Sequence, residues 1–470
     1  TLKADSICPY LTTFKASGNL ALIPDATFNT ALSVLLSSDY GAELPTKLAS
    51  LTIGAPGTSG VNQTKANIDL RPVSAVGPIK LYGADLTFEG DISSDVASGT
   101  GVLLKATKSI TTLRSVTTLG GDVVLWSRAG SLESSTDEGK ISLENAASIS
   151  SSGGEIIIAG SVLTDTDGYP IGHTYFNSGA ALYLGTAANA PVNLNSANGL
   201  IRLYAKAGPS AGQAIALVNN GTAATFSSGT GRQDLNFIGS GTGDNVFESW
   251  GPITFSSSAD AGTDGLTAAI KFYVNQTNSG NGLTPIQQQA SFLHKFVASG
   301  TGGLDVTVTS ANTGVYAIDY SRAFNFLAAS GKINLDFGVN GLDLTSTTAA
   351  GFVVGALSGT NSSSNIVISG DRFNEVTANA TADAFVLRTS STVIVKPSSQ
   401  SFSSAQTFDS TWAFPGITNV NGGFIAALTI GQSGTNGTVS GLTQNNSDVT
   451  LSGDMTVAGP ISIYGKSINV

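Results

Sequence analysis

Few residues of this chain are of the types that carry out nucleophilic, acid/base or metal chemistry. Its 470 residues include two histidines and one cysteine. The stretch "GPSAG" (208–212) matches the Gly-x-Ser-x-Gly nucleophile pattern at Ser210, and His294 follows downstream. That pattern requires a strand, a strained turn and then a helix, whereas the "QAIALVNNG" that follows has the apolar run of another short strand. We therefore interpret Ser210 as a turn residue and predict no catalytic residue.

Two further motifs are typical of phosphate or metal binding. "GKS" (465–467) matches the end of a phosphate-binding loop, but that loop requires a glycine where this chain has Pro460. "TDTDG" (164–168) spaces Asp165 and Asp167 as in a calcium loop, without the bidentate glutamate that completes one. We expect a polar turn there, with a weak Ca²⁺ site as the alternative. No cofactor is predicted.

Carboxylates and tryptophans leave carbohydrate chemistry open. Glycoside hydrolysis requires two carboxyl groups about 5 to 9.5 Å apart. The acidic residues that could form such a pair are Asp69, Asp85, Asp91, Asp122, Asp137, Asp336 and Asp371. Trp126, Trp250 and Trp412 could stack on sugar rings, but each lies in or beside an apolar segment, which favours a role in the core or in capping a coil.

The elements that must position these residues are short apolar segments, most of them introduced by glycine. They read "GPIKLYG", "GVLLKA", "GGDVVLWS", "GKISLEN", "GGEIIIAG", "GLIRLYAK", "GPITFSS", "GKINLDFG", "SNIVISGD", "SDVTLSGD" and "GPISIYGK". Inward and outward positions alternate in each, which is the period-two pattern of a β-strand. Asn, Ser and Thr between them can hydrogen-bond to the backbone and stack on their equivalents in adjacent coils. The spacing between Ile79 and Ile156 predicts coils of about 20 residues.

These features predict an all-β fold: a right-handed parallel β-helix (β-solenoid) with short helical or loop insertions. Apolar residues at helical spacing predict one helix over 24–39 and another over 284–296, where Thr284 is the expected N-cap and Pro285 the first helical residue. The expected divisions are an N-terminal capping segment (1–50), solenoid (51–260), an insertion with a short helix (261–300) and solenoid to the last coil (301–470).

Composition excludes several classes of function. Charged residues make up 11% of the chain, against about 25% in a typical globular protein. The net charge is −10 and no cluster of Lys or Arg occurs, so nucleic acid is not an expected partner. No run approaches the roughly 18 to 20 apolar residues of a membrane span, so no transmembrane segment is predicted. Cys8 stands alone, so no intrachain disulfide stabilises the fold.

Two phrases recur in the same order along the chain. "LTIGAPGTSG" at Leu51 is answered by "LTIGQSGTNG" at Leu428, and "AVGPIKLYGADLTF" (75–88) is answered by "VAGPISIYGKSINV" (457–470). A third, poorer copy is "SWGPITFSSSADAG" (249–262). We interpret each copy as a coil rather than as a site. Because the last copy resembles an early coil, we expect copies of the chain to associate end to end into a filament or longer array.

The phrases "GGDVVLWSRAGS" (120–131), "GKISLENAASISSSGGEIIIAG" and "VAGPISIYGKSINV" resemble the filamentous haemagglutinin family, the large exoproteins that bacteria export by a two-partner route. The resemblance is clearest in residues 51–160 and 425–470. It implies a right-handed β-helix on the outside of a bacterial cell, acting as an adhesin, a matrix scaffold or a stalk. It carries over no functional residue, because the shared residues of the family build coils.

We therefore predict a non-enzymatic extracellular protein with a structural or adhesive role. It would be a rigid rod or fibre subunit in surface attachment, filament formation or a biofilm matrix, with a cell-surface or glycan ligand. The alternative is a carbohydrate-active or glycan-binding β-helix protein.

Overall fold

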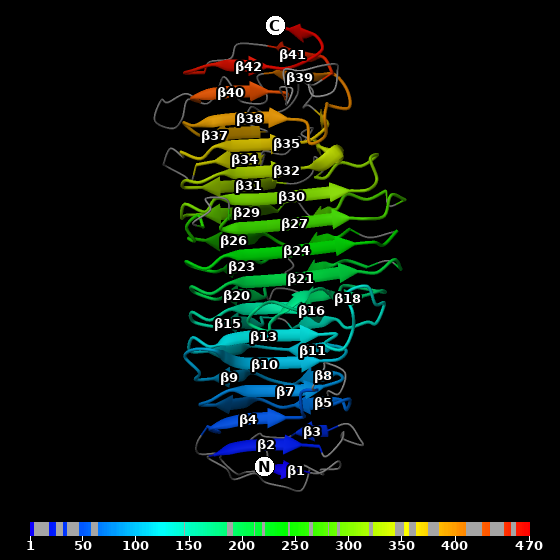
Figure 1. Ribbon diagram of the computed structural model, residues 1–470, viewed down its shortest axis with the longest axis vertical. Helices are drawn as coiled ribbons and strands as arrows, with labels where there is room; N and C mark the ends of the chain where they lie inside the picture. The colour runs from blue at the N-terminus through cyan, green and yellow to red at the C-terminus, as the bar shows by residue number, and fades with distance from the viewer. Residues whose placement is uncertain are drawn as a thin grey trace. The chain divides into compact units, whose positions relative to one another are not determined.

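A computed structural model shows an almost entirely β-stranded chain, with long ladders of parallel strands stacked as in a parallel β-helix (Figure 1). Two units divide it, Thr1–Gly241 and Thr242–Val470. The structure describes residues 1–3, 18–24, 32–34, 47–57, 64–144, 146–185, 191–210, 212–218, 221–242, 245–262, 267–280, 282–288, 292–318, 323–343, 352–356, 363–374, 385–409, 425–432, 446–452 and 457–470.

In the described residues of the first unit, the strands form three parallel ladders, and most coils contribute one strand to each. The first ladder contains β1 (Leu2–Lys3), β2 (Asn19–Ile23), β4 (Ser50–Ile53), β7 (Ile79–Gly83), β10 (Thr100–Ala106), β13 (Asp122–Ser127), β16 (Ile156–Thr164), β21 (Ile201–Ala207) and β24 (Gln233–Gly239). The second contains β3 (Leu32–Val34), β5 (Ile68–Leu70), β8 (Leu86–Phe88), β11 (Ile110–Leu113), β14 (Ile141–Leu143), β19 (Leu182–Leu184) and β22 (Ile215–Leu217). The third contains β6 (Val73–Ala75), β9 (Ile92–Ser94), β12 (Val116–Thr118), β15 (Ser148–Ser150), β20 (Asn193–Asn195) and β23 (Ala224–Ser227).

The second unit repeats this parallel stacking. Its longest ladder contains β27 (Ile270–Gln276), β30 (Leu304–Ser310), β32 (Ile333–Asp336), β35 (Ile366–Ser369), β38 (Thr392–Lys396), β40 (Ala427–Ile430) and β42 (Ile461–Ile463). Another contains β26 (Ile253–Ser257), β29 (Leu293–Ala298), β31 (Ala323–Ala328), β34 (Phe352–Gly355) and β37 (Phe385–Arg388). Shorter pairings join β25 (Phe247–Ser249) to β28 (Ile286–Gln288), β33 (Leu342–Asp343) to β36 (Phe373–Asn374), and β39 (Gln406–Asp409) through β41 (Val449–Ser452) to β43 (Ile468–Asn469).

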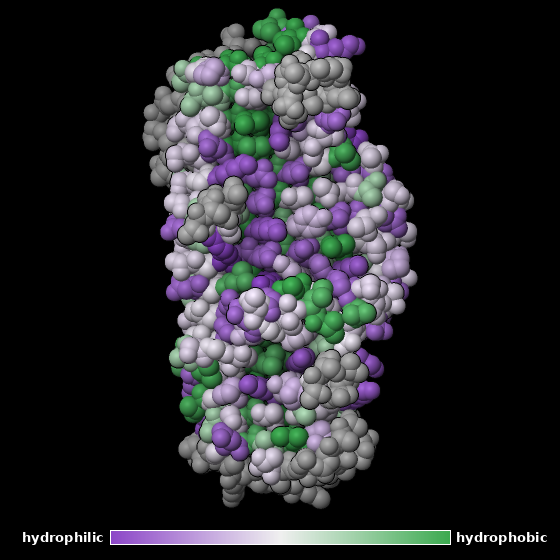
Figure 2. Space-filling view, viewed as in Figure 1, coloured by the Kyte–Doolittle hydropathy of each residue, from purple (hydrophilic) through white to green (hydrophobic). Residues whose placement is uncertain are grey.

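Strand alternation places the core inside the coils. Each apolar segment expected to be a strand contains one, from β7 to β42. In the first unit Val102, Val123 and Ile156 occupy successive rungs and are fully buried. Each such side chain contributes about 1.5 to 3 kcal/mol when it leaves water. The outward positions of β27, β30 and β32 are less buried, and Figure 2 shows hydrophilic side chains gathered over these strands.

In the second unit, aromatic side chains stack on one another from coil to coil. The rings of Phe255 and Phe296 stack at 4.8 Å, and those of Phe296 and Phe326 at 5.2 Å, both with interplanar angles of 18°. These residues occupy matching positions of β26, β29 and β31. In-register pairing therefore places like side chains on like, and the rings of this ladder form a column.

Polar side chains at one corner accept hydrogen bonds from the backbone N–H groups of the bends. Asn67 Oδ1 accepts the Asp85 N–H (3.3 Å), Asp85 Oδ1 accepts the Ser109 N–H (3.2 Å) and Ser109 Oγ accepts the Lys140 N–H (3.2 Å). Each residue thus bonds the next coil through its side chain. The expected hydrogen bonding of such polar side chains to the backbone is confirmed at this corner.

The predicted helix over 284–296 is wrong. Strands β28 and β29 occupy this stretch, and Ile286 pairs with Phe247. Pro285, expected to open a helix, instead accepts the Val246 N–H through its carbonyl oxygen (2.9 Å). Ladder hydrogen bonds and burial against the neighbouring coil outweigh the local helical preference. The insertion expected over 261–300 is also wrong, because β27, β28 and β29 pair in register with neighbouring strands.

The other predicted helix, over 24–39, meets a strand as well. Strand β3 spans Leu32–Val34 and pairs with β5, so a helix is wrong at these three residues. Apart from Pro24, the rest of that segment lies outside the described residues.

In each unit, the strands of the two recurrent phrases are adjacent rungs of the same ladder. Leu51 pairs with Ile79, and Leu428 pairs with Ile461. The glycine after each first strand has a positive φ, 78° at Gly54 and 83° at Gly431. A Cβ atom there would overlap a carbonyl oxygen of the next coil, that of Tyr82 or of Tyr464 respectively.

The glycine that opens each second phrase is constrained in the same way. A Cβ atom on Gly77 would overlap the Ala49 carbonyl oxygen, and one on Gly459 would overlap that of Ala426. The echo is therefore a two-coil corner with the same backbone contacts in each unit. The third copy (249–262) differs, because its strand β26 pairs with β29 and belongs to another ladder than β42.

Replacing Gly54 by alanine tests this corner. We expect Gly54→Ala to lower the free energy of unfolding by about 1–3 kcal/mol more than Gly99→Ala, because the added methyl overpacks a backbone carbonyl. Gly99 is the matched control: its φ is also positive (69°), but nothing lies within 4 Å of the place that an added methyl group would take. Chemical denaturation followed by circular dichroism measures both variants. Equal losses would contradict the contact.

Candidate functional site

The coils of the first unit differ in length, and the longest that its strand pairing defines runs from Ile156 to Ile201. Ile79, Val102 and Val123 follow one another at close to the expected coil length, but Ile156 and then Ile201 come much later. The extra residues form two excursions on the flank, residues 128–139 and 161–176. We call them together the lateral lobe.

The second excursion interrupts a single rung of the ladder. Strand β16 pairs with β21 through Ile156–Ile158, then leaves the sheet and turns back as β17 (Pro170–Gly172), antiparallel to it. Strand β18 (Thr174–Phe176) then takes its place beside the second half of β21. Gly160 and Gly172 allow this close antiparallel approach, since a Cβ on Gly160 would lie 2.5 Å from the His173 carbonyl oxygen.

The hairpin covers an apolar patch on the outside of the wall. Outward-facing Val124, Trp126, Ile157 and Ala159 form a buried cluster with Ala129, against which other residues of the wall and hairpin pack. The Trp126 indole N–H donates to the Ser161 carbonyl oxygen (2.6 Å). Trp126 is therefore a buried anchor of the lobe, not a platform for sugar. Around it the lobe exposes further apolar side chains, and Figure 2 shows hydrophobic surface at the level of β16 and β18.

A fully buried arginine holds the two excursions together. The Arg128 guanidinium donates to the carbonyl oxygens of Asp137 (2.7 Å), Leu132 (3.1 Å), Ser135 (2.8 Å) and His173 (3.0 Å). Burial lowers the pKa of Arg128, and the nearby carboxylates of Glu133 and Asp137 act in the opposite direction. The side chain replaces the water that these loop carbonyls would otherwise require.

A carboxylate–imidazole pair forms the second link between the excursions. Glu133 Oε1 lies 2.7 Å from His173 Nδ1, and Glu133 Oε2 accepts the His173 main-chain N–H (2.9 Å). The imidazole also stacks on Tyr204 of β21, with ring centroids 5.4 Å apart. Burial would raise the pKa of Glu133, but the hydrogen bonds from His173 outweigh burial and hold this pKa below its usual value.

The tip of the hairpin is fixed by Asp165. Its Oδ1 accepts the N–H groups of Asp167 (3.1 Å) and Tyr169 (2.8 Å), and its Oδ2 pairs with Arg202 Nη1 (2.7 Å). Both oxygens are committed to the turn and to the wall, as in the polar turn expected for "TDTDG". Within the described ranges, no group of three or more His, Cys, Asp or Glu residues could hold a metal ion.

Asp122 anchors the base of the hairpin and perturbs its neighbours. It accepts the Tyr169 hydroxyl (2.5 Å) and the Glu155 N–H (2.8 Å). Burial and then the hydrogen bond to Asp122 raise the pKa of Tyr169 to about 12. Burial and then the charge of Asp122 also raise the pKa of Glu155. Glu155 is thus a carboxyl group that holds its proton more tightly than an exposed glutamate does.

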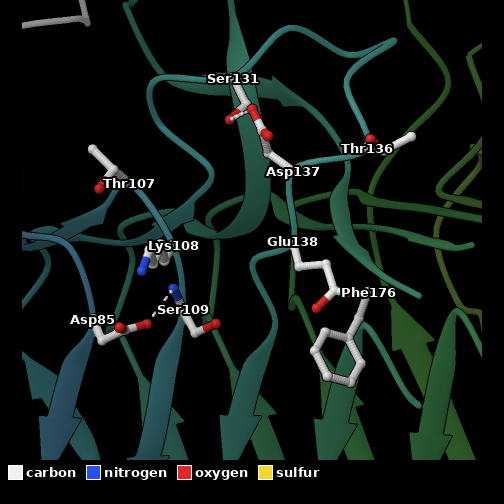
Figure 3. Close-up of a pocket in the computed structure, with 9 residues that line it drawn as sticks. All are labelled: Asp85, Thr107, Lys108, Ser109, Ser131, Thr136, Asp137, Glu138 and Phe176. Carbon is white, nitrogen blue, oxygen red and sulfur yellow. Dashed lines mark hydrogen bonds between the residues drawn. The ribbon is translucent and has the colours of Figure 1, made fainter. Parts of the chain in front are cut away.

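Between the lobe and the corner of the wall lies a polar pocket of about 610 Å³. Its lining residues are Asp85, Thr107, Lys108, Ser109, Ser131, Thr136, Asp137, Glu138 and Phe176. Figure 3 shows Asp85, Lys108 and Ser109 on one side, Ser131 and Asp137 near the top, and Glu138 above the Phe176 ring. Hydrogen bonds from Ser135 and then Ser131 lower the pKa of Asp137, so it is ionised at neutral pH.

The other residues singled out in the sequence lie apart from this pocket. Exposed Ser210 is hydrogen-bonded to Asn177 at a bend (3.1 Å). His294 is buried, with Nε2 2.7 Å from Ser249 Oγ and Nδ1 accepting the Ile253 N–H (3.3 Å). Nδ1 is therefore the acceptor nitrogen of this imidazole, and Nε2 donates to Ser249.

Trp250 and the phosphate-loop match make local structural contacts. Half-exposed Trp250 donates to Glu248 (2.9 Å). Trp412 lies outside the described residues. Lys466 of "GKS" donates its main-chain N–H to Ser447 (3.0 Å), as part of a coil.

Of the seven candidate aspartates, the pocket brings together Asp85 and Asp137. Glu138, Lys108 and Phe176 were not identified from the sequence, nor was Arg128. The available signal was the long interval between the strand at Val123 and those that follow, with the acidic run "LESSTDEGK" inside it.

The fold and the pocket define the class of protein: a parallel β-helix protein that carries a lateral lobe. No family model, no curated protein and no solved structure matches the chain. Over the ranges that the structure describes, no helix has the length and apolar character needed to cross a membrane.

Arg128→Met tests the lobe's central contact. We expect the local free energy of opening of the lobe to fall by about 3 kcal/mol or more, because four carbonyls lose their donor. Hydrogen exchange should accelerate at Gly139 and Val162, whose N–H groups bond the excursions to each other, but not at Leu104 in the wall. The control is Arg114→Met, since Arg114 is exposed and 3.5 Å from Glu144. Unchanged exchange at Gly139 would refute the role of Arg128.

Lowering the pH should weaken the link that Glu133 and His173 form between the two excursions. The folded state lowers the pKa of Glu133, so its stabilising contribution is present above the carboxyl's unfolded value of 4.5 and is lost as pH falls through the lower folded value. The melting temperature of Glu133→Gln should therefore lie below that of the parent at pH 6, and the gap should shrink below pH 4.5. A gap that stays constant down to pH 3 would contradict a stabilising role for the ionised Glu133 carboxylate.

Proposed function

We propose that this chain is part of a non-enzymatic extracellular scaffold with an adhesive role, in which the β-helix displays the lateral lobe. The observation that carries the proposal is the combination of a regular, apolar, in-register wall with one elaborated flank that holds a ligand-sized polar pocket. Solenoid coils need no such excursion for their stability, and the ordering of its residues costs conformational entropy.

Composition and resemblance support the exported setting. Charged residues are sparse, and a single cysteine means that the chain does not depend on intrachain disulfides. Its coil phrases resemble those of the filamentous haemagglutinin family, whose members act outside bacterial cells. A bacterial cell surface or biofilm matrix is therefore the proposed location.

A carbohydrate-active enzyme is the second candidate, and Glu155 is the observation that favours it. Burial and then the charge of Asp122 raise the pKa of Glu155, as is expected of a general acid. The pocket carboxylates Asp85 and Asp137 add a second acidic pair.

One experiment separates the two functions. Beads coated with the purified chain should adhere to polysaccharide-coated surfaces, while a polysaccharide panel incubated with the chain should release no reducing ends. Deletion of residues 161–172 tests whether adhesion depends on the lobe, with retained strand content by circular dichroism as the control. Reducing-end release that Glu155→Gln abolishes would overturn the scaffold proposal in favour of the enzyme.

A further inference from the structure

We propose that the pocket between the lobe and the wall binds a short saccharide that carries a free amine. This inference rests on the adhesive function proposed above and names the chemistry of its ligand. It is drawn from the pocket's size, its hydrogen-bonding groups, its charge and its aromatic floor.

Size and hydrogen-bonding groups favour a saccharide. A volume of about 610 Å³ lies within the range of roughly 300 to 1,000 Å³ that small-molecule sites span. Hydroxyl groups come from opposite sides: Thr107 and Ser109 from the wall, Ser131 and Thr136 from the lobe. Hydroxyls that both donate and accept match a polyhydroxylated ligand better than an apolar one.

The carboxylates are fixed in place but keep acceptor capacity. Asp85 uses Oδ1 for the Ser109 N–H (3.2 Å), and Glu138 uses Oε1 for the Asn177 N–H (3.3 Å). One oxygen of each is thus anchored to the backbone while the other can accept from a ligand. Anchored acceptors lose little entropy on binding.

The charged residues of the pocket favour some classes of saccharide over others. Three carboxylates, Asp85, Asp137 and Glu138, line the pocket with Lys108, and the Lys140 ammonium lies 5.3 Å from the centroid of the lining Phe176 ring. Uronic acids and sulfated or phosphorylated sugars would meet like charge here. An ammonium group would gain charge-assisted hydrogen bonds, which are about twice as strong as neutral ones.

The aromatic floor suits the same ligand. The half-buried Phe176 ring has the Lys140 ammonium 5.3 Å from its centroid. Glu138 and Phe176 both line the pocket, and in the view of Figure 3 the Glu138 side chain lies above the ring. The hydrophobic C–H face of a sugar ring can pack on Phe176 while its amine reaches Glu138.

The test uses titration calorimetry of the whole chain at pH 6 with three probes: the β-1,4-linked glucosamine dimer, its N-acetylated counterpart and spermidine. We expect the free-amine dimer to bind, and the N-acetylated dimer and spermidine to bind at least about tenfold more weakly. Glu138→Gln should weaken the dimer about five- to tenfold. Glu144→Gln, whose carboxylate pairs with Arg114 outside the pocket, should not change it.

Each contrary outcome overturns the inference. Equal binding of the N-acetylated dimer would indicate a neutral-sugar site, and equal binding of spermidine a site for any organic cation. No binding by a chain that still adheres to polysaccharide would refute this ligand but leave the scaffold function standing. Unaltered affinity in Glu138→Gln, with an unaltered melting temperature, would place the ligand elsewhere.

Discussion

Backbone hydrogen bonding between successive coils, at a rung spacing of about 4.8 Å, is the constraint on which this structure depends. At the corners the spacing leaves no room for a side chain, which is why Gly54, Gly77, Gly431 and Gly459 recur where they do. Inside the coils it stacks each side chain on its counterpart, as the phenylalanine column of the second unit shows. Where the chain bends, side-chain oxygens such as Asp85 Oδ1 accept the N–H groups of the following coil.

The lateral lobe adds residues without breaking this ladder. Strand β16 leaves the wall only where β18 replaces it beside β21, so the next coil still meets a full-length partner. The excursion's own carbonyls then need donors away from the sheet, and Arg128 supplies them. Because the interior is filled by stacked apolar side chains, any chemistry that a ligand could reach has to lie on the outer face, among excursions of this kind.

Much of the fold could be predicted from the sequence because the strand signal is local, whereas the site depends on contacts with the backbone. Alternating apolar residues, most of them after glycine, were sufficient to locate strands such as β7, β10, β13 and β21. Ile286 lies in a pattern that predicts a helix, but it is held in a strand by pairing with Phe247, far away in the sequence. Arg128 binds four carbonyl oxygens, which any residues can supply, so no side-chain motif accompanies it. Asp85 and Asp137 could be named as acidic residues, but only the excursion's path brings them to one pocket.

Some charged residues of the lobe both stabilise it and line the pocket. Separating these two roles identifies the residue whose charge is most informative about a ligand. Asp137 lines the pocket, but it also faces the buried Arg128, whose charge it helps to stabilise together with Glu133. Its negative charge therefore has a structural cause whether or not a ligand binds. Glu138 is not among the groups that act on Arg128, and the Asn177 N–H that it accepts would be satisfied equally by a neutral amide oxygen. The negative charge of Glu138 thus takes no part in holding Arg128, which makes it the pocket charge that best reports on a cationic ligand.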